Sequence, residues 1–187
     1  MAPPPSDPTD VHADGLMTTD PSNRGHNFLW DAHATRGSPI PHSARTIASY
    51  ILSLQDDAAG SAISNMKLQK LLYYAQGIYV AVNGADDPLF ADRIFAWDHG
   101  PVITTVYQEY CRYRKKALPL ADRPTLSEYD SSIVQEVYRV FSKFSSWQLR
   151  VMTHAETPWK KHYRPHELNI EIPRADLETY FKQYIKT

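Results

Sequence analysis

The sequence predicts a mainly α-helical domain of about six helices, with one small extended element before an Asp-His-Gly-Pro turn. Apolar residues recur at spacings of three and four in several stretches, which is the period of a helix that buries one face. Most of these stretches open with a serine or a proline, the residues that commonly begin helices. Only residues 93–97 have the composition of a short strand, and the chain contains no internal repeat.

The first two helices are expected after a proline-rich start. One covers residues 43–54, whose first serine can act as the N-cap. The next covers residues 65–82, with Ser64 or Asn65 as its cap and Gly84 as part of its stop signal. This second helix is apolar over most of its circumference, so we expect it in the centre of a helical bundle.

The extended element leads into the turn. Arg93–Trp97 predicts a short strand, and Asp98-His99 follows it. Gly100-Pro101 is expected to start a helix that continues to Tyr113, because proline is favoured at the first helical position.

Three more helices are expected over residues 132–144, 145–153 and 173–185. The first two begin with a serine that is followed three positions later by a glutamine, the pattern of a capping box. Pro158 is expected to prevent continuation of the second helix, and Pro173 is expected to start the third.

The composition favours a soluble cytoplasmic protein. The chain has 187 residues, with 20 basic and 21 acidic side chains. This balance gives no overall attraction to nucleic acid or to a membrane surface. No apolar run approaches the roughly 20 residues of a membrane helix, and the start of the chain lacks the pattern of a secretion signal. A single cysteine, Cys111, fits a reducing compartment.

The chain is expected to divide into a flexible arm, residues 1–42, and a helical domain, residues 43–187. The arm is rich in proline and small polar residues, so it lacks the apolar surface that would offset the entropy of ordering. Phe28-Leu29-Trp30 is the apolar cluster within it. Phe28 and Trp30 could dock on the chain's own domain, or they could anchor a partner and become ordered with it.

No catalytic, metal or cofactor site is predicted. The residues considered were Asp98 with His99, His154 with Glu156, Cys111, and His162 with His166. Neighbouring residues point to different sides of an element, and Pro165 disturbs the helical spacing between the last two histidines. Cys111 is interpreted as a small buried apolar residue. No phosphate-binding loop, dinucleotide motif or zinc ribbon is present, so an enzyme is not expected.

Two basic runs could bind nucleic acid. They are Arg112–Lys116 and Lys160–Arg164, each with one tyrosine. We favour solvated helix ends for both, where cations also interact well with the helix dipole. A nucleic-acid-binding autoregulator therefore remains an alternative of a different class.

Several separated sequence blocks resemble the Panacea domain, the family of SocA-like antitoxins and phage-associated proteins. The blocks are KLQKLLYYAQ from Lys67, PLF from Pro88, AWDHGPV from Ala96 and the pair Val106-Tyr107, with Thr153-His154 and Pro158-Trp159 towards the end. The resemblance covers about residues 43–163. It implies a mostly helical domain that neutralises a toxin encoded beside it, by binding that toxin. In the SocA branch it also implies delivery of the toxin to a Clp-type protease.

Physical reasoning gives expected roles to residues of the shared blocks and to two residues of the arm, which lies outside the shared domain. Those expected to be structural are Lys67, Leu68, Lys70, Leu71, Tyr73, Tyr74, Gly100, Pro101, Val102, His154, Pro158 and Trp159. Those expected to contact a partner are Phe95, Trp97, Asp98, His99 and Tyr107, together with Phe28 and Trp30 of the arm. Trp97 and His99 have an alternative role in holding the turn. Phe95 departs from the family, in which an acidic or polar residue is more usual.

The sequence therefore predicts a non-enzymatic antitoxin that neutralises its toxin by direct binding. A proteolytic adaptor, a nucleic-acid-binding autoregulator and an undetected hydrolase are the alternatives. The expected partner is a protein toxin, with a Clp-type protease as a second partner of the adaptor.

Overall fold

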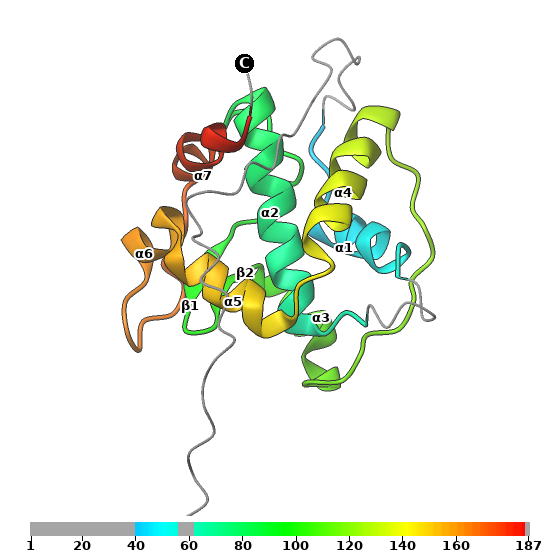
Figure 1. Cartoon of the computed structure of the whole chain (residues 1–187), viewed down its shortest axis with the longest axis horizontal. Helices are drawn as coiled ribbons and strands as arrows, with labels where there is room; N and C mark the ends of the chain where they lie inside the picture. Colours follow the sequence, from blue (N-terminus) through cyan, green and yellow to red (C-terminus); the bar gives the residue numbers. More distant parts are fainter. Residues whose placement is uncertain (1–39, 56–61, 186–187) are drawn as a thin grey trace, which may run out of the picture.

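The computed structural model describes residues 40–55 and 62–185, and its architecture is mainly α-helical as predicted (Figure 1). The elements in chain order are α1 (Ala44–Leu52), α2 (Asn65–Asn83), β1 (Phe95–Trp97), β2 (Gly100–Val102), α3 (Thr104–Tyr110), the 3₁₀ turn η2 (Cys111–Tyr113), α4 (Glu128–Phe141), α5 (Ser146–Ala155), α6 (Thr157–His162), α7 (Arg174–Phe181) and the 3₁₀ turn η3 (Lys182–Tyr184). No helix in these residues has the length and apolar character needed to span a bilayer.

Helix α2 is the centre of the fold, as its sequence predicts. Nearly all of its residues are buried, and α1, α4, α5 and α7 all contact it. Figure 1 shows α2 between α4 and α1 on one side and α6 and α7 on the other. Ser64 caps its first turn by accepting the amide of Lys67, and Gly84 follows its end with a φ of 97°. A helix enclosed on every side fits an almost continuously apolar sequence.

Aromatic rings fill the space between α2, α4 and α7. The Tyr74 ring stacks on Phe141 with 3.9 Å between centroids, and Phe181 packs edge-on against Tyr73 and Tyr74. Gly77 permits this arrangement, because a Cβ atom at its position would lie 2.3 Å from the Phe181 ring. The aromatic packing therefore depends on a residue without a side chain in the middle of α2.

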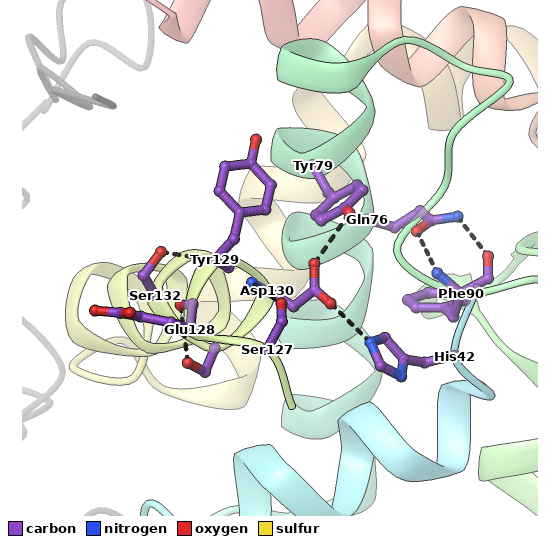
Figure 2. A network of polar contacts seen from close by, with 10 residues as sticks. His42, Gln76, Tyr79, Phe90, Ser127, Glu128, Tyr129, Asp130 and Ser132 are labelled. Carbon is purple, nitrogen blue, oxygen red and sulfur yellow. Dashed lines mark hydrogen bonds and ion pairs between the residues drawn. The ribbon is translucent and has the colours of Figure 1, made fainter. Parts of the chain in front are cut away.

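A buried polar network joins the start of the described domain to α2 and α4 (Figure 2). Asp130 is 1% exposed, and its two carboxylate oxygens contact His42 Nε2 at 2.9 Å and the Tyr79 hydroxyl at 3.0 Å. Ser127 accepts the backbone amide of Asp130 and caps α4. The backbone of His42 also forms an isolated parallel β-bridge with Phe90. Because a buried carboxylate needs partners, this network fixes how α4 sits against α2.

Two predicted helix starts are wrong. Gly100-Pro101 does not begin a helix, because both residues belong to β2, and α3 starts only at Thr104. Proline is tolerated in a short edge strand, where it needs no amide donor. The cap of α4 is Ser127 and not Ser132, so α4 begins more than one turn earlier than expected.

The later helices agree better with the sequence. Ser145 and Gln148 form the predicted capping box at the start of α5. Pro158 does separate α5 from the following residues, but it also lies in the first turn of α6, which was not expected. The described residues thus contain seven α-helices where about six were predicted. Residues 1–39 of the predicted arm, with Phe28 and Trp30, lie outside the described residues.

Candidate interaction site at the hairpin

The Asp-His-Gly-Pro sequence forms the tip of a two-stranded hairpin. β1 and β2 are antiparallel, with Trp97 opposite Gly100, so Asp98 and His99 are the two exposed residues of the connection. Gly100 has a φ of 96°, which favours glycine. A Cβ at this position would also lie 2.8 Å from Lys70 Cε and 2.9 Å from Thr153 Oγ1, so Gly100 brings the hairpin close to both α2 and α5.

A pocket of about 260 Å³ lies between this hairpin, the start of α2 and α3, and we call it the hairpin pocket. Its lining includes Lys70, Trp97, Asp98, His99, Val102 and Tyr107. The rings of Trp97 and Tyr107 meet edge to face at 5.1 Å. The indole nitrogen of Trp97 is buried, and no acceptor in the described part of the chain contacts it. The lining of the pocket therefore combines aromatic surface with a residue whose hydrogen-bond donor has no acceptor among the described residues.

Lys70 is the most unusual residue of the hairpin pocket. It is 1% exposed, and its ammonium group donates to the carbonyl oxygen of Pro101 at 2.9 Å. Burial, and next the nearby positive charge of Arg150, lower the pKa of Lys70 from 10.5 to about 7. The chain therefore holds an ionisable amine beneath the hairpin at a cost to the folded state.

Stacked rings support the back of the hairpin. Trp159 lies between His154 and Tyr163, with ring centroids 3.8 Å and 4.4 Å away. The Trp159 indole donates to the carbonyl oxygen of Trp97 at 3.0 Å, and the Tyr163 hydroxyl donates to Asp98 at 3.1 Å. These contacts tie Trp97 and Asp98, at the start of the connection, to α6 and to the residue that follows it, so the hairpin tip has a fixed support.

His154 is also unusual within this support. Burial is the main cause that lowers its pKa from 6.5 to about 4, and the charges of Arg150, Lys70 and His99 add to the effect. Its Nε2 atom is buried without a partner among the described residues. The region beneath the hairpin therefore concentrates positive charge, and His154 stays neutral there at physiological pH.

The structure brings together four of the residues expected to contact a partner. Trp97, Asp98, His99 and Tyr107 all line the hairpin pocket. Phe95 does not line it. Phe95 is half-buried, and its backbone forms an isolated antiparallel bridge with Glu171.

The residues expected to be structural are mostly in the core. The buried members are Lys67, Leu68, Lys70, Leu71, Tyr73, Tyr74, Gly100, Pro101, Val102, Pro158 and Trp159, whereas His154 is partly buried. Lys67 donates to the carbonyl oxygen of Ser142 at 2.6 Å, away from the hairpin pocket. Lys70 and Val102 combine burial with a place in the pocket lining, and Lys70 is the charged residue of the two.

Sequence reasoning missed a surface on α5 beside the hairpin. Trp147 is 61% exposed, and the Arg150 guanidinium lies 4.7 Å from the centre of its ring. Arg150 also reaches the carbonyl oxygen of Asp98 at 3.4 Å, so Trp147 lies close to the hairpin tip. Val151, one turn after Trp147, is exposed as well. The available signal was helical spacing, because Leu149 faces the core and leaves Trp147 on the other side of α5.

Of the side chains considered for catalysis, Asp98, His99 and Cys111 line the hairpin pocket, whereas His154, Glu156, His162 and His166 are not part of its lining. Cys111 is exposed, so its interpretation as a buried apolar residue is wrong; it sits in the 3₁₀ turn after α3, which lies at the surface. His162 pairs with Asp176 at 2.5 Å, and His166 lies in an exposed loop. Within residues 40–55 and 62–185, no group of three His, Cys, Asp or Glu residues is placed to hold a metal ion.

Comparison with known proteins identifies one protein family. Residues 68–160 match the family model described as antitoxin SocA-like, Panacea domain. The matched segment runs from the first turn of α2 to α6 and contains the whole hairpin. Comparison with curated proteins and with solved structures gave no significant match.

Proposed function

We propose that this chain, which belongs to the SocA-like antitoxin family with a Panacea domain, neutralises a protein toxin by binding it directly. The observation that carries the proposal is the hairpin pocket, most of whose lining residues lie within the matched segment. It offers aromatic surface from Trp97 and Tyr107 together with the unpaired donor of the Trp97 indole. Exposed aromatic residues around a pocket with free hydrogen-bonding capacity are typical of the centre of a protein interface.

The fixed support of the hairpin favours binding by a preformed surface. Trp159 and Tyr163 hold the connection from behind, and Lys70 contacts β2 from below. A surface that is already ordered loses little conformational entropy when a partner binds, so more of the contact energy appears as affinity. Such a surface suits an inhibitor that blocks its target by occupying it.

The exposed face of α5 extends the proposed interface. Trp147 and Val151 add apolar area next to the hairpin tip, and Arg150 lies between Trp147 and Asp98. Tryptophan and arginine are enriched among the residues that contribute most to binding energy. We therefore place the toxin across the hairpin and α5.

Co-expression with the protein encoded by the adjacent gene tests the proposal. If that protein is the toxin, the two should purify as a stable complex, and the antitoxin should restore growth only when present in at least equal amount. Rescue by much less antitoxin, with the toxin chemically altered, would indicate an enzyme. Rescue that requires a Clp-type protease and toxin degradation would indicate an adaptor, and rescue by repression of the toxin gene would indicate an autoregulator.

Two matched variants test the surface. Tyr107 is 38% exposed and lines the hairpin pocket, whereas Leu120 is 56% exposed and does not line it. Tyr107→Ala should weaken the complex by about 1–3 kcal/mol, and Leu120→Ala should leave affinity unchanged. Equal effects of the two substitutions would place the toxin elsewhere.

A further inference from the structure

We infer that the hairpin pocket receives a carboxylate side chain, an aspartate or a glutamate of the partner protein, with Lys70 and the Trp97 indole as its hydrogen-bond donors. The inference rests on the proposed function, because it specifies the chemistry of the partner at the same site. It has an independent test, however, which requires no toxin.

The two donors have capacity that the fold does not use. The Lys70 ammonium carries three N–H groups, and one of them donates to the carbonyl oxygen of Pro101. The Trp97 indole can only donate, and it is buried without an acceptor in the described part of the protein. A ligand that supplies acceptor oxygens would satisfy both residues, and a carboxylate accepts on both of its oxygens.

The amide side chains on the pocket wall are already engaged. Gln69 donates to Asn65 at 3.0 Å and accepts the backbone amide of Ile103 at 2.8 Å. Asn65 in turn donates to the carbonyl oxygen of Tyr107 at 3.1 Å. These bonds fix the wall of the pocket and leave one N–H of each amide group over. Among the described residues of the lining, Lys70 is the buried cation, and the Trp97 indole is the buried donor without any acceptor.

The charge around the pocket favours an anion. The charges of Arg150, Lys70 and His99 each lower the pKa of His154, so all three basic groups lie near this histidine. Arg114 adds a guanidinium to the pocket lining. Asp98 is the acidic residue of that lining, and its carboxylate already accepts the Tyr163 hydroxyl. An incoming carboxylate would therefore meet more positive than negative charge.

The walls favour an amino-acid side chain over a phosphate. Met66, Val102 and Leu168 contribute apolar surface to the lining. The methylene groups of aspartate or glutamate can contact such surface while the carboxylate reaches the donors. A phosphate carries polar oxygens on every side, so it would leave some of them against apolar walls.

A titration of the full chain with matched small molecules tests the inference. The protein is labelled with ¹⁵N in its indole groups and titrated with N-acetylglutamate N-methylamide or with the corresponding glutamine compound. The glutamate compound should move the Trp97 indole signal saturably, and the glutamine compound should bind at least ten-fold more weakly. Trp147 supplies a reference signal, because it does not line the pocket, whereas the Trp159 indole donates to the Trp97 carbonyl oxygen and can follow its movement.

Two lysine variants sharpen the result. Lys70→Met should weaken binding of the glutamate compound at least ten-fold, whereas Lys67→Met should not, because Lys67 is buried on the same helix but contacts Ser142 outside the pocket. The comparison of the two compounds on the unmodified chain stands even if a variant fails to fold.

Three outcomes would overturn the inference. They are an unmoved Trp97 signal, equal affinity for the two compounds, and tighter binding of inorganic phosphate than of the glutamate compound. A toxin complex that forms despite any of them would leave the proposed function intact and remove only the carboxylate site. If the chain binds the glutamate compound but no toxin, the carboxylate site stands and the proposed function is wrong.

Discussion

Replacing Lys70 with methionine should make the protein more stable, even though it removes a buried hydrogen bond. Lys70 is fully enclosed, and its pKa is about 7 in the folded chain against 10.5 for an exposed lysine. Below about pH 7 the amine is charged in both the folded and unfolded states, so the folded state bears the whole cost of the buried charge. The two pKa values correspond to about 5 kcal/mol at most.

The sign of the pH dependence follows from proton binding. Between the folded pKa of about 7 and the unfolded value of 10.5, the unfolded chain binds more protons at Lys70 than the folded chain does. Stability should therefore rise with pH across this window, by about 2–3 kcal/mol between pH 6 and pH 9. Lys70→Met removes this contribution and leaves the Pro101 carbonyl oxygen without its donor, which costs about 1–3 kcal/mol. The net gain should be about 2–4 kcal/mol at pH 6 and smaller at pH 9.

Urea unfolding at pH 6, 7.5 and 9 measures this difference directly. Lys143→Met is the matched control, because Lys143 is an exposed lysine on the surface after α4. Subtracting each variant's stability curve from that of the unmodified chain cancels the titrating groups that do not interact with the substituted lysine. A Lys70→Met difference that stays constant from pH 6 to pH 9 would refute the reasoning, because it would show that Lys70 keeps an ordinary pKa in the fold.

Other substitutions probe the core, the support of the hairpin and the polar network. Gly77→Ala should destabilise the protein by about 2–4 kcal/mol, because the new methyl group would displace the Phe181 ring. Thermal melting measures this loss, and an unchanged melting temperature would contradict the packing of Phe181 against Gly77. The pKa of His154 is about 4 in the fold, so protonation of this histidine below about pH 6.5 favours the unfolded chain. His154→Gln should therefore reduce the loss of stability on acidification, by about 1 kcal/mol at pH 5 after allowing for solvent screening. Melting temperatures that fall equally with pH in the variant and the unmodified chain would argue against it. Asp130→Ala should cost about 3–5 kcal/mol by leaving Tyr79 and His42 without their shared acceptor, and Asp130→Asn should cost less in the same denaturation assay.

Local patterns in the sequence predicted the elements that depend on local chemistry. Ser64 and Ser145 cap helices where their neighbours allow it, and the apolar circumference of α2 places that helix in the centre. Ser132 failed as a cap because Ser127 offers an equivalent hydroxyl one turn earlier, next to the acidic residues Glu128 and Asp130 of the first turn. Propensity alone could not choose between the two serines.

Long-range contacts explain what sequence reasoning missed. Pro101 reads as a helix start by itself, yet the pairing of Ala96 with Pro101 makes it part of a strand. Asp130 is 88 residues from His42 and 51 from Tyr79, so nothing in the local sequence marks it as the centre of a network. Such contacts appear only when the chain is folded.

The residues of the shared blocks differ in whether packing alone explains them. Leu68 and Leu71 obey the rule that apolar residues are buried, and packing explains them fully. Lys70, one position before Leu71, violates it at a substantial cost in stability. Trp97, which lines the same pocket as Lys70, carries a buried donor without an acceptor among residues 40–55 and 62–185. Proteins tolerate such violations chiefly where they serve function, and both lie in one pocket. We therefore propose that selection for binding explains these two residues, which stability alone does not explain.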